Sequence, residues 1–94
     1  MTNDEVTKAT RAYNLAVIDA YTAWRRASKK AEADFFRMLR TVTGAGQEEY
    51  EKVMVPAADE ARRAHQEAGE RREEAVRKAR ETYEEAVAMA ELSW

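Results

Sequence analysis

Apolar side chains recur every eleven residues in the first half of the chain. The aromatic residues Tyr13, Trp24 and Phe35 follow this spacing. Eleven residues complete three turns at about 3.67 residues per turn, close to the 3.6 of a straight α-helix, so such residues stay on one face. The pattern predicts a long helix with a nearly straight apolar seam. Two further series share the spacing: Ala9, Ala20, Ala31 and Val42, and Ala16, Ala27 and Met38.

The second half of the chain repeats this spacing and contains the single proline, Pro56. A proline inside a helix removes one backbone hydrogen bond and clashes with the preceding turn. The apolar spacing nevertheless continues from Tyr50 and Val53 to Ala57 and Ala61. We therefore expect one helix, kinked near Pro56. The series are Val53, Ala64, Ala75 and Ala86; Ala57, Ala68, Ala79 and Ala90; and Tyr50, Ala61, Arg72, Tyr83 and Trp94.

A glycine-dense segment, Thr43-Gly44-Ala45-Gly46, separates the two halves. Gly44 lacks a Cβ and so permits the left-handed conformation that commonly closes a helix. The sequence predicts an all-α fold, an antiparallel helical hairpin in a single domain of residues 1–94. Its parts are a helix over about residues 4–42, a turn over 43–46 and a second helix over about 47–92.

Folding the chain about Ala45 places residue i of the first helix near residue 90 − i of the second. Large rings of the first helix then face alanines of the second, which lets two helices approach closely. The same rule brings Arg72 near Asp19 and predicts an ion pair between them. The predicted core comprises Tyr13, Trp24, Phe35, Ala64, Ala68, Ala75, Ala79 and Tyr83.

Charge supports this pairing of the two halves. The chain has 36 % charged residues and a net charge of −2, but residues 1–46 carry +3 and residues 47–94 carry −5. Exposed ion pairs are worth only about 0–1 kcal/mol each, so the asymmetry is expected to select the alignment more than to stabilise it.

The sequence contains little that could perform chemistry. His65 is the only histidine and there is no cysteine, so multi-histidine and thiolate metal sites are excluded. We expect His65 at the border of the apolar face, in a structural role. The carboxylates of the second half alternate with arginines, as on a solvated helix face. We predict no catalytic, metal-binding or cofactor-binding residues and a protein that is not an enzyme.

A basic stripe of Arg26, Lys30, Arg37 and Arg40 lies on the first helix. Nucleic acid is not the expected partner, because the chain has a pI near 5.5 and its acidic half would repel a polyanion. A membrane is not expected either, since no stretch approaches the roughly 18 apolar residues of a span and the seam is mostly alanine. We expect a cytoplasmic protein, with secretion independent of a signal peptide as the alternative.

Several large apolar residues do not fit one two-helix seam, and small domains without disulfides or metals usually need oligomerisation. We therefore expect a protein–protein interaction module that forms a homodimer, as a four-helix bundle, and presents a helix face to another protein. A small acidic helical inhibitor or regulator of another protein is an alternative. The predicted partner interface comprises Leu15, Ile18, Tyr21, Met89, Leu92 and Trp94, while Phe36 and Leu39 remain near the turn.

A cysteine-free hairpin of just under one hundred residues also resembles the WXG100 or ESAT-6-like substrates of type VII secretion in length and architecture. This resemblance implies a dimer that is exported without a classical signal peptide. The family's Trp-x-Gly motif belongs in the turn, where this chain has Thr43-Gly44-Ala45-Gly46. Its C-terminal Tyr-x-x-x-Asp/Glu signal is not matched, because Val87 stands four residues after Tyr83. The similarity is one of shape, and a type VII substrate or partner is a further alternative.

Overall fold

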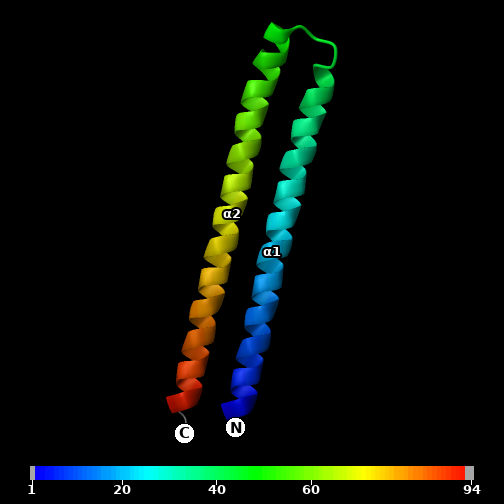
Figure 1. The fold of residues 1–94 in the computed structure, drawn as a ribbon. Helices are drawn as coiled ribbons and strands as arrows, with labels where there is room; N and C mark the ends of the chain where they lie inside the picture. Colours follow the sequence, from blue (N-terminus) through cyan, green and yellow to red (C-terminus); the bar gives the residue numbers. More distant parts are fainter. Residues whose placement is uncertain (1, 93–94) are drawn as a thin grey trace. The chain divides into compact units, whose positions relative to one another are not determined.

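The computed structural model describes the backbone of residues 2–92 and the side chains of residues 4–92. Throughout this range the chain is all-α, with helix α1 over Thr2–Thr41 and helix α2 over Gln47–Leu92, joined by a short loop (Figure 1). The expected all-helical fold with two long helices is thereby confirmed.

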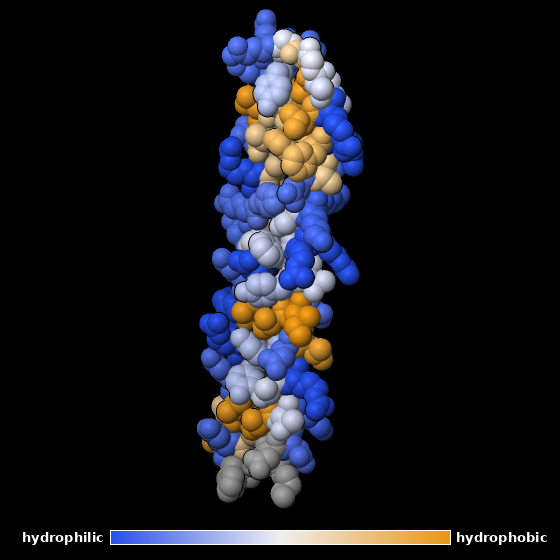
Figure 2. All heavy atoms as spheres, turned by 45° about the vertical axis from the view of Figure 1, so that its right-hand side comes forward, coloured by the Kyte–Doolittle hydropathy of each residue, from blue (hydrophilic) through white to orange (hydrophobic). Residues whose placement is uncertain are grey.

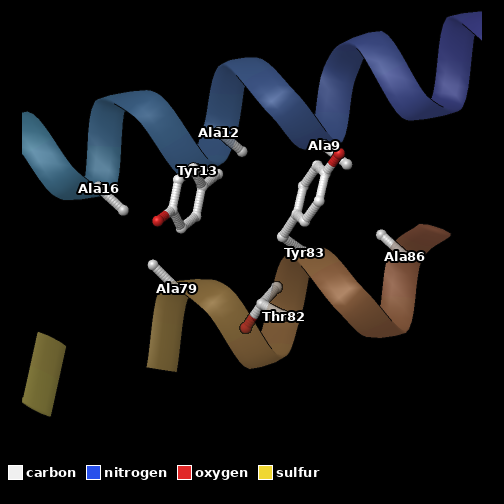
Figure 3. A pocket seen from close by; sticks show the side chains of 8 residues that line it. All are labelled: Ala9, Ala12, Tyr13, Ala16, Ala79, Thr82, Tyr83 and Ala86. Carbon is white, nitrogen blue, oxygen red and sulfur yellow. The ribbon is translucent and has the colours of Figure 1, made fainter. Parts of the chain in front are cut away.

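The chain divides into two compact units, each built from parts of both helices. Unit 1 combines Met1–Ala23 with Arg71–Trp94, and unit 2 is the continuous segment Trp24–Glu70, which contains the loop. In unit 1, Ala9 of α1 lies opposite Ala86 of α2, and Ala16 lies opposite Ala79 (Figure 3). The two helical segments of unit 1 are therefore antiparallel.

The loop of unit 2 ends α1 as the glycine pattern predicts. Gly44 has a φ of +84°, in the left-handed region that residues with a Cβ rarely adopt. The amide of Ala45 donates to the carbonyl of Val42 at 3.0 Å, and the hydroxyl of Thr41 donates to the carbonyl of Met38 at 2.6 Å. These bonds satisfy carbonyl groups that the end of a helix leaves without helical partners.

Pro56 does not interrupt α2, which continues from Gln47 to Leu92 as one helix. The proline is exposed, and so is Lys52, whose carbonyl would otherwise accept the missing hydrogen bond. The proline therefore lies on the solvent side of α2, where its ring does not disturb the seam. The kink near Pro56 stays a prediction.

Few of residues 4–92 are buried, and most of these are small. In the described part of unit 1 the buried apolar residues are Ala20 and Ala90. In unit 2 they are Ala31, Val42, Met54 and Ala68. The core is therefore a thin seam in which alanine dominates, and larger side chains are at most half-buried beside it, with Val42 and Met54 as the exceptions.

The alignment expected from folding the chain about Ala45 is wrong in unit 1. That rule places Tyr13 near residue 77, but its ring packs on Tyr83, six positions further along α2, with a centroid distance of 5.7 Å and an interplanar angle of 48°. The rule counted residues from the turn and ignored side-chain volume. The two rings lie where alanines of the facing helix leave room, Tyr13 beside Ala79 and Tyr83 beside Ala9 (Figure 3).

Candidate interaction surface

The predicted partner interface consists of exposed side chains in unit 1. Leu15 and Ile18 of α1 are 57 % and 58 % exposed, and Met89 of α2 is 66 % exposed. Leu92 and Tyr21 are exposed as well. Trp94, which we expected at the end of this surface, lies outside the described residues.

Unit 2 has its own exposed apolar residues near the turn, which we call the turn cluster: Phe36, Met38, Tyr50 and Val55. An apolar area is visible at this end of the molecule (Figure 2). The rings of Phe35 and Phe36 meet edge to face with centroids 5.8 Å apart. Sequence reasoning singled out Phe36 but missed the other three, because Met38 and Tyr50 belong to the eleven-residue series that we assigned to the seam.

The eight predicted core residues differ in burial. Ala68 is buried, and Trp24 and Ala64 of unit 2 are half-buried. Ala75 is exposed, which corrects its assignment to the core. A step of four residues from Arg72 reaches Val76, which is half-buried, so Val76 takes the seam position and Ala75 lies outside it. The other half-buried members are Tyr13, Phe35, Ala79 and Tyr83.

A pocket of about 170 Å³ lies between the two helical segments of unit 1 (Figure 3). The rings of Tyr13 and Tyr83 flank it, and short side chains complete its wall. The hydroxyl of Thr82 is occupied, because it donates to the carbonyl of Lys78 at 3.0 Å. The pocket is therefore mainly apolar. Its lining residues are Ala9, Ala12, Tyr13, Ala16, Ala79, Thr82, Tyr83 and Ala86.

Sequence reasoning missed this pocket because it set Tyr13 against alanines alone and did not place the ring of Tyr83 beside it. The available signal was that Tyr13 and Tyr83 belong to the aromatic-containing series of their two helices. An alignment displaced by six residues brings the two series together. We call the lined space the Tyr13–Tyr83 pocket.

Arg72 contacts an aromatic ring of α1. Its guanidinium lies over the ring of Tyr21, 5.3 Å from the centroid. The ion pair between Arg72 and Asp19 stays a prediction. Arg72 and Tyr21 both belong to unit 1, and Arg72 is half-buried on the seam. A planar guanidinium stacks on an aromatic face while its alkyl stem covers apolar surface, which makes arginine tolerable at this position.

Several ion pairs of the described residues lie along single helices. In unit 2, Arg37 pairs with Asp34 and Arg62 with Asp59. In unit 1, Arg77 contacts both Glu74 and Glu81. These pairs therefore do not join the basic first half of the chain to its acidic second half.

The contacts of Arg77 change the pKa values of two side chains. The hydrogen bond from Arg77 lowers the pKa of Glu74, and the same hydrogen bond raises the pKa of Arg77. Both side chains are exposed, so these shifts reflect a local pair on the helix surface.

His65 is exposed, so it is not the partly buried structural histidine that we expected. Within residues 4–92, no group of three or more His, Cys, Asp or Glu side chains is arranged to hold a metal ion. Neither helix, as far as it is described, contains a segment long and apolar enough to cross a membrane.

Comparison with protein-family models, with curated proteins and with solved structures finds no significant match for this chain. The candidate surface is therefore interpreted from its own geometry: exposed leucine, isoleucine and methionine side chains beside a small apolar pocket in unit 1, and the turn cluster in unit 2.

Proposed function

We propose that this protein is a non-catalytic protein–protein interaction module that self-associates through its helical faces, as a homodimer in the form of a four-helix bundle. The observation that carries the proposal is the area that the single chain exposes, 7551 Å². A compact monomer of this mass exposes about 5,500 Å² by the usual scaling of surface with size. Roughly 2,000 Å² is thus in excess.

The size of this excess fits an interface. A standard protein–protein interface buries about 800 Å² on each partner, and obligate homodimers bury more. The excess is rich in apolar side chains, since Leu15, Ile18, Met89 and the turn cluster are all exposed. Association with a second copy would bury part of this excess area.

The thin seam supports the same proposal. The buried apolar residues of the described chain are four alanines with Val42 and Met54. A small domain with so little large apolar burial is rarely stable alone in the absence of disulfides or metals. A second hairpin would cover the half-buried valines and tyrosines that flank the seam.

Burial also supports the eleven-residue repeat as the basis of the helical faces. The buried residues Ala20 and Ala31 of α1, and Val42 directly after its end, are eleven residues apart. Residues at this spacing lie on one face of the helix, so each can pack at a similar position in a long helical bundle. Exposed apolar residues that the dimer leaves uncovered are available to another protein.

Sedimentation over a concentration series tests this function. We expect a dimer at micromolar concentration, together with a melting temperature that rises with protein concentration because association stabilises the folded state. Ile18→Lys should weaken the dimer, whereas Arg26→Gln, a change at an exposed polar position, should not. A folded monomer at micromolar concentration with a constant melting temperature would refute self-association.

A further inference from the structure

We propose that Leu15 of a second copy fills the Tyr13–Tyr83 pocket, so that each copy of the dimer supplies one leucine and one pocket. This inference rests on the proposed self-association and identifies the contact within it. Leu15 and all residues that line the pocket belong to unit 1.

The pocket has the size of one apolar side chain. Its volume is about 170 Å³. A dry cavity of about 150 Å³ lined by apolar side chains takes up benzene, whereas sites for drug-sized ligands measure roughly 300–1,000 Å³. The space therefore suits a leucine-sized group better than a cofactor or metabolite.

The side chains that line the pocket leave this space unfilled. The two rings meet at one point, with a centroid distance of 5.7 Å, and the remaining wall consists of alanines and one threonine. Alanine side chains are too short to reach across from either helix (Figure 3). A side chain inserted from outside would gain dispersion contacts with the two aromatic rings.

The pocket faces the same side of unit 1 as Leu15. Ala12 and Thr82 line the pocket and are both exposed, so they mark the side on which it opens. Leu15 follows Ala12 by three residues, and residues three apart are neighbours on a helix surface. Leu15 is 57 % exposed at this rim, where it covers little of its own chain.

A face that carries both a projecting leucine and a hole is self-complementary. In a twofold dimer, contact of residue i with residue j implies the reciprocal contact, so one leucine–pocket fit is made twice. Insertion of a side chain into a hole formed by a facing helix pair is also how helical bundles pack. The excess exposed area, roughly 2,000 Å² per chain, is enough for such a pair of contacts within a larger interface.

The absence of cysteine from the sequence permits a direct test. Leu15→Cys is made in one copy and Thr82→Cys in another, and the two are mixed and oxidised. We expect the mixture to form a disulfide between positions 15 and 82 of different copies, because the proposed contact brings these positions together. The matched control replaces Leu15→Cys by Ile18→Cys, since Ile18 is equally exposed but lies one turn away from the pocket rim.

A second variant tests the pocket without altering the leucine. Ala12→Phe should fill the pocket from its own chain and weaken the dimer roughly tenfold or more, since burial of one leucine side chain is worth at least that factor. The melting temperature of the dilute protein should not fall, because the added ring packs on Tyr13. Ala33→Phe, at an exposed alanine of unit 2, serves as the control and should leave the dimer unchanged.

The outcomes separate this inference from the proposed function. A dimer in sedimentation that forms no link between positions 15 and 82, or that is unaffected by Ala12→Phe, overturns the leucine–pocket contact and leaves self-association standing. In that case the pocket is free for another protein or a small apolar molecule. A chain that is monomeric at every concentration overturns both.

Discussion

Units 1 and 2 are built from the same two helices but bury different side chains. Unit 2 buries Val42 and Met54 in addition to two alanines, whereas the buried apolar residues of unit 1 are Ala20 and Ala90. In unit 1 the large rings meet around a pocket instead of filling the seam. Alanine allows helices to approach closely but contributes little buried area, so unit 2 has the better core of its own.

The two units also differ in how far apart in sequence their helical segments lie. Unit 2 contains the loop and closes over a short distance in sequence, while unit 1 joins segments separated by the whole of unit 2. Closing a short loop costs less conformational entropy than closing a long one. We therefore expect unit 2 to stay folded without a second copy of the chain. The stability of unit 1 should depend more on a partner.

Met54→Ala should cause the largest loss of stability. Met54 is 4 % exposed, and truncation of a buried methionine to alanine costs about 2–5 kcal/mol. Hydrogen exchange should show the loss of protection chiefly in unit 2. Val55→Ala, at an exposed neighbouring position, is the control and should change little. If the two variants melt at the same temperature, unit 2 does not have the core described here.

Tyr83→Ala should have an intermediate effect, because it removes a half-buried ring from unit 1. We expect roughly half of the 3–5 kcal/mol that a fully buried aromatic residue loses. Tyr83→Phe retains the ring and should lose little. Thermal melting at low and at high protein concentration distinguishes the contributions of the chain and of the dimer. An equal effect of Tyr83→Ala and Met54→Ala in the dilute protein would remove the proposed difference between the units.

The sequence predicts well the features that depend on local structure. The left-handed Gly44 could be foreseen because one glycine-dense segment interrupts two helical patterns, and the start of α2 at Gln47 follows from it. The sequence also predicted that α2 continues through Pro56, because the apolar spacing continues across the proline.

The candidate site could be predicted only in part. Exposure of Leu15 and Ile18 followed from their poor fit to the seam, but the Tyr13–Tyr83 pocket did not. Its existence depends on the alignment of two helices, and a rule that counts residues from the turn contains no information on how the side chains fill the space. The exposure of Ala75 has the same origin, since one residue of drift moves a side chain by about 100° around a helix.

Gly44→Ala tests the contribution of the loop to unit 2. Nothing lies within 4 Å of the position of the added Cβ, so the cost comes from the φ of +84° alone. A left-handed conformation costs an alanine about 1–2 kcal/mol, and the melting temperature should fall accordingly. Gly46→Ala is the matched control, because its surroundings are equally open and its φ is not positive. Equal melting temperatures for the two variants would show that the loop relaxes at no cost.

Arg77→Gln should have the smallest effect and should depend on pH. Arg77 lowers the pKa of Glu74 in the folded protein below its unfolded value, so the pair stabilises unit 1 fully above that unfolded value, near 4.3, and less as the pH falls through the lowered folded value. Thermal melting should therefore show a small deficit for Arg77→Gln at neutral pH that disappears in strong acid. Arg80→Gln, an exposed arginine on the same helix, is the control. A deficit that persists in acid would mean that the alkyl stem of Arg77, and not its charge, contributes to unit 1.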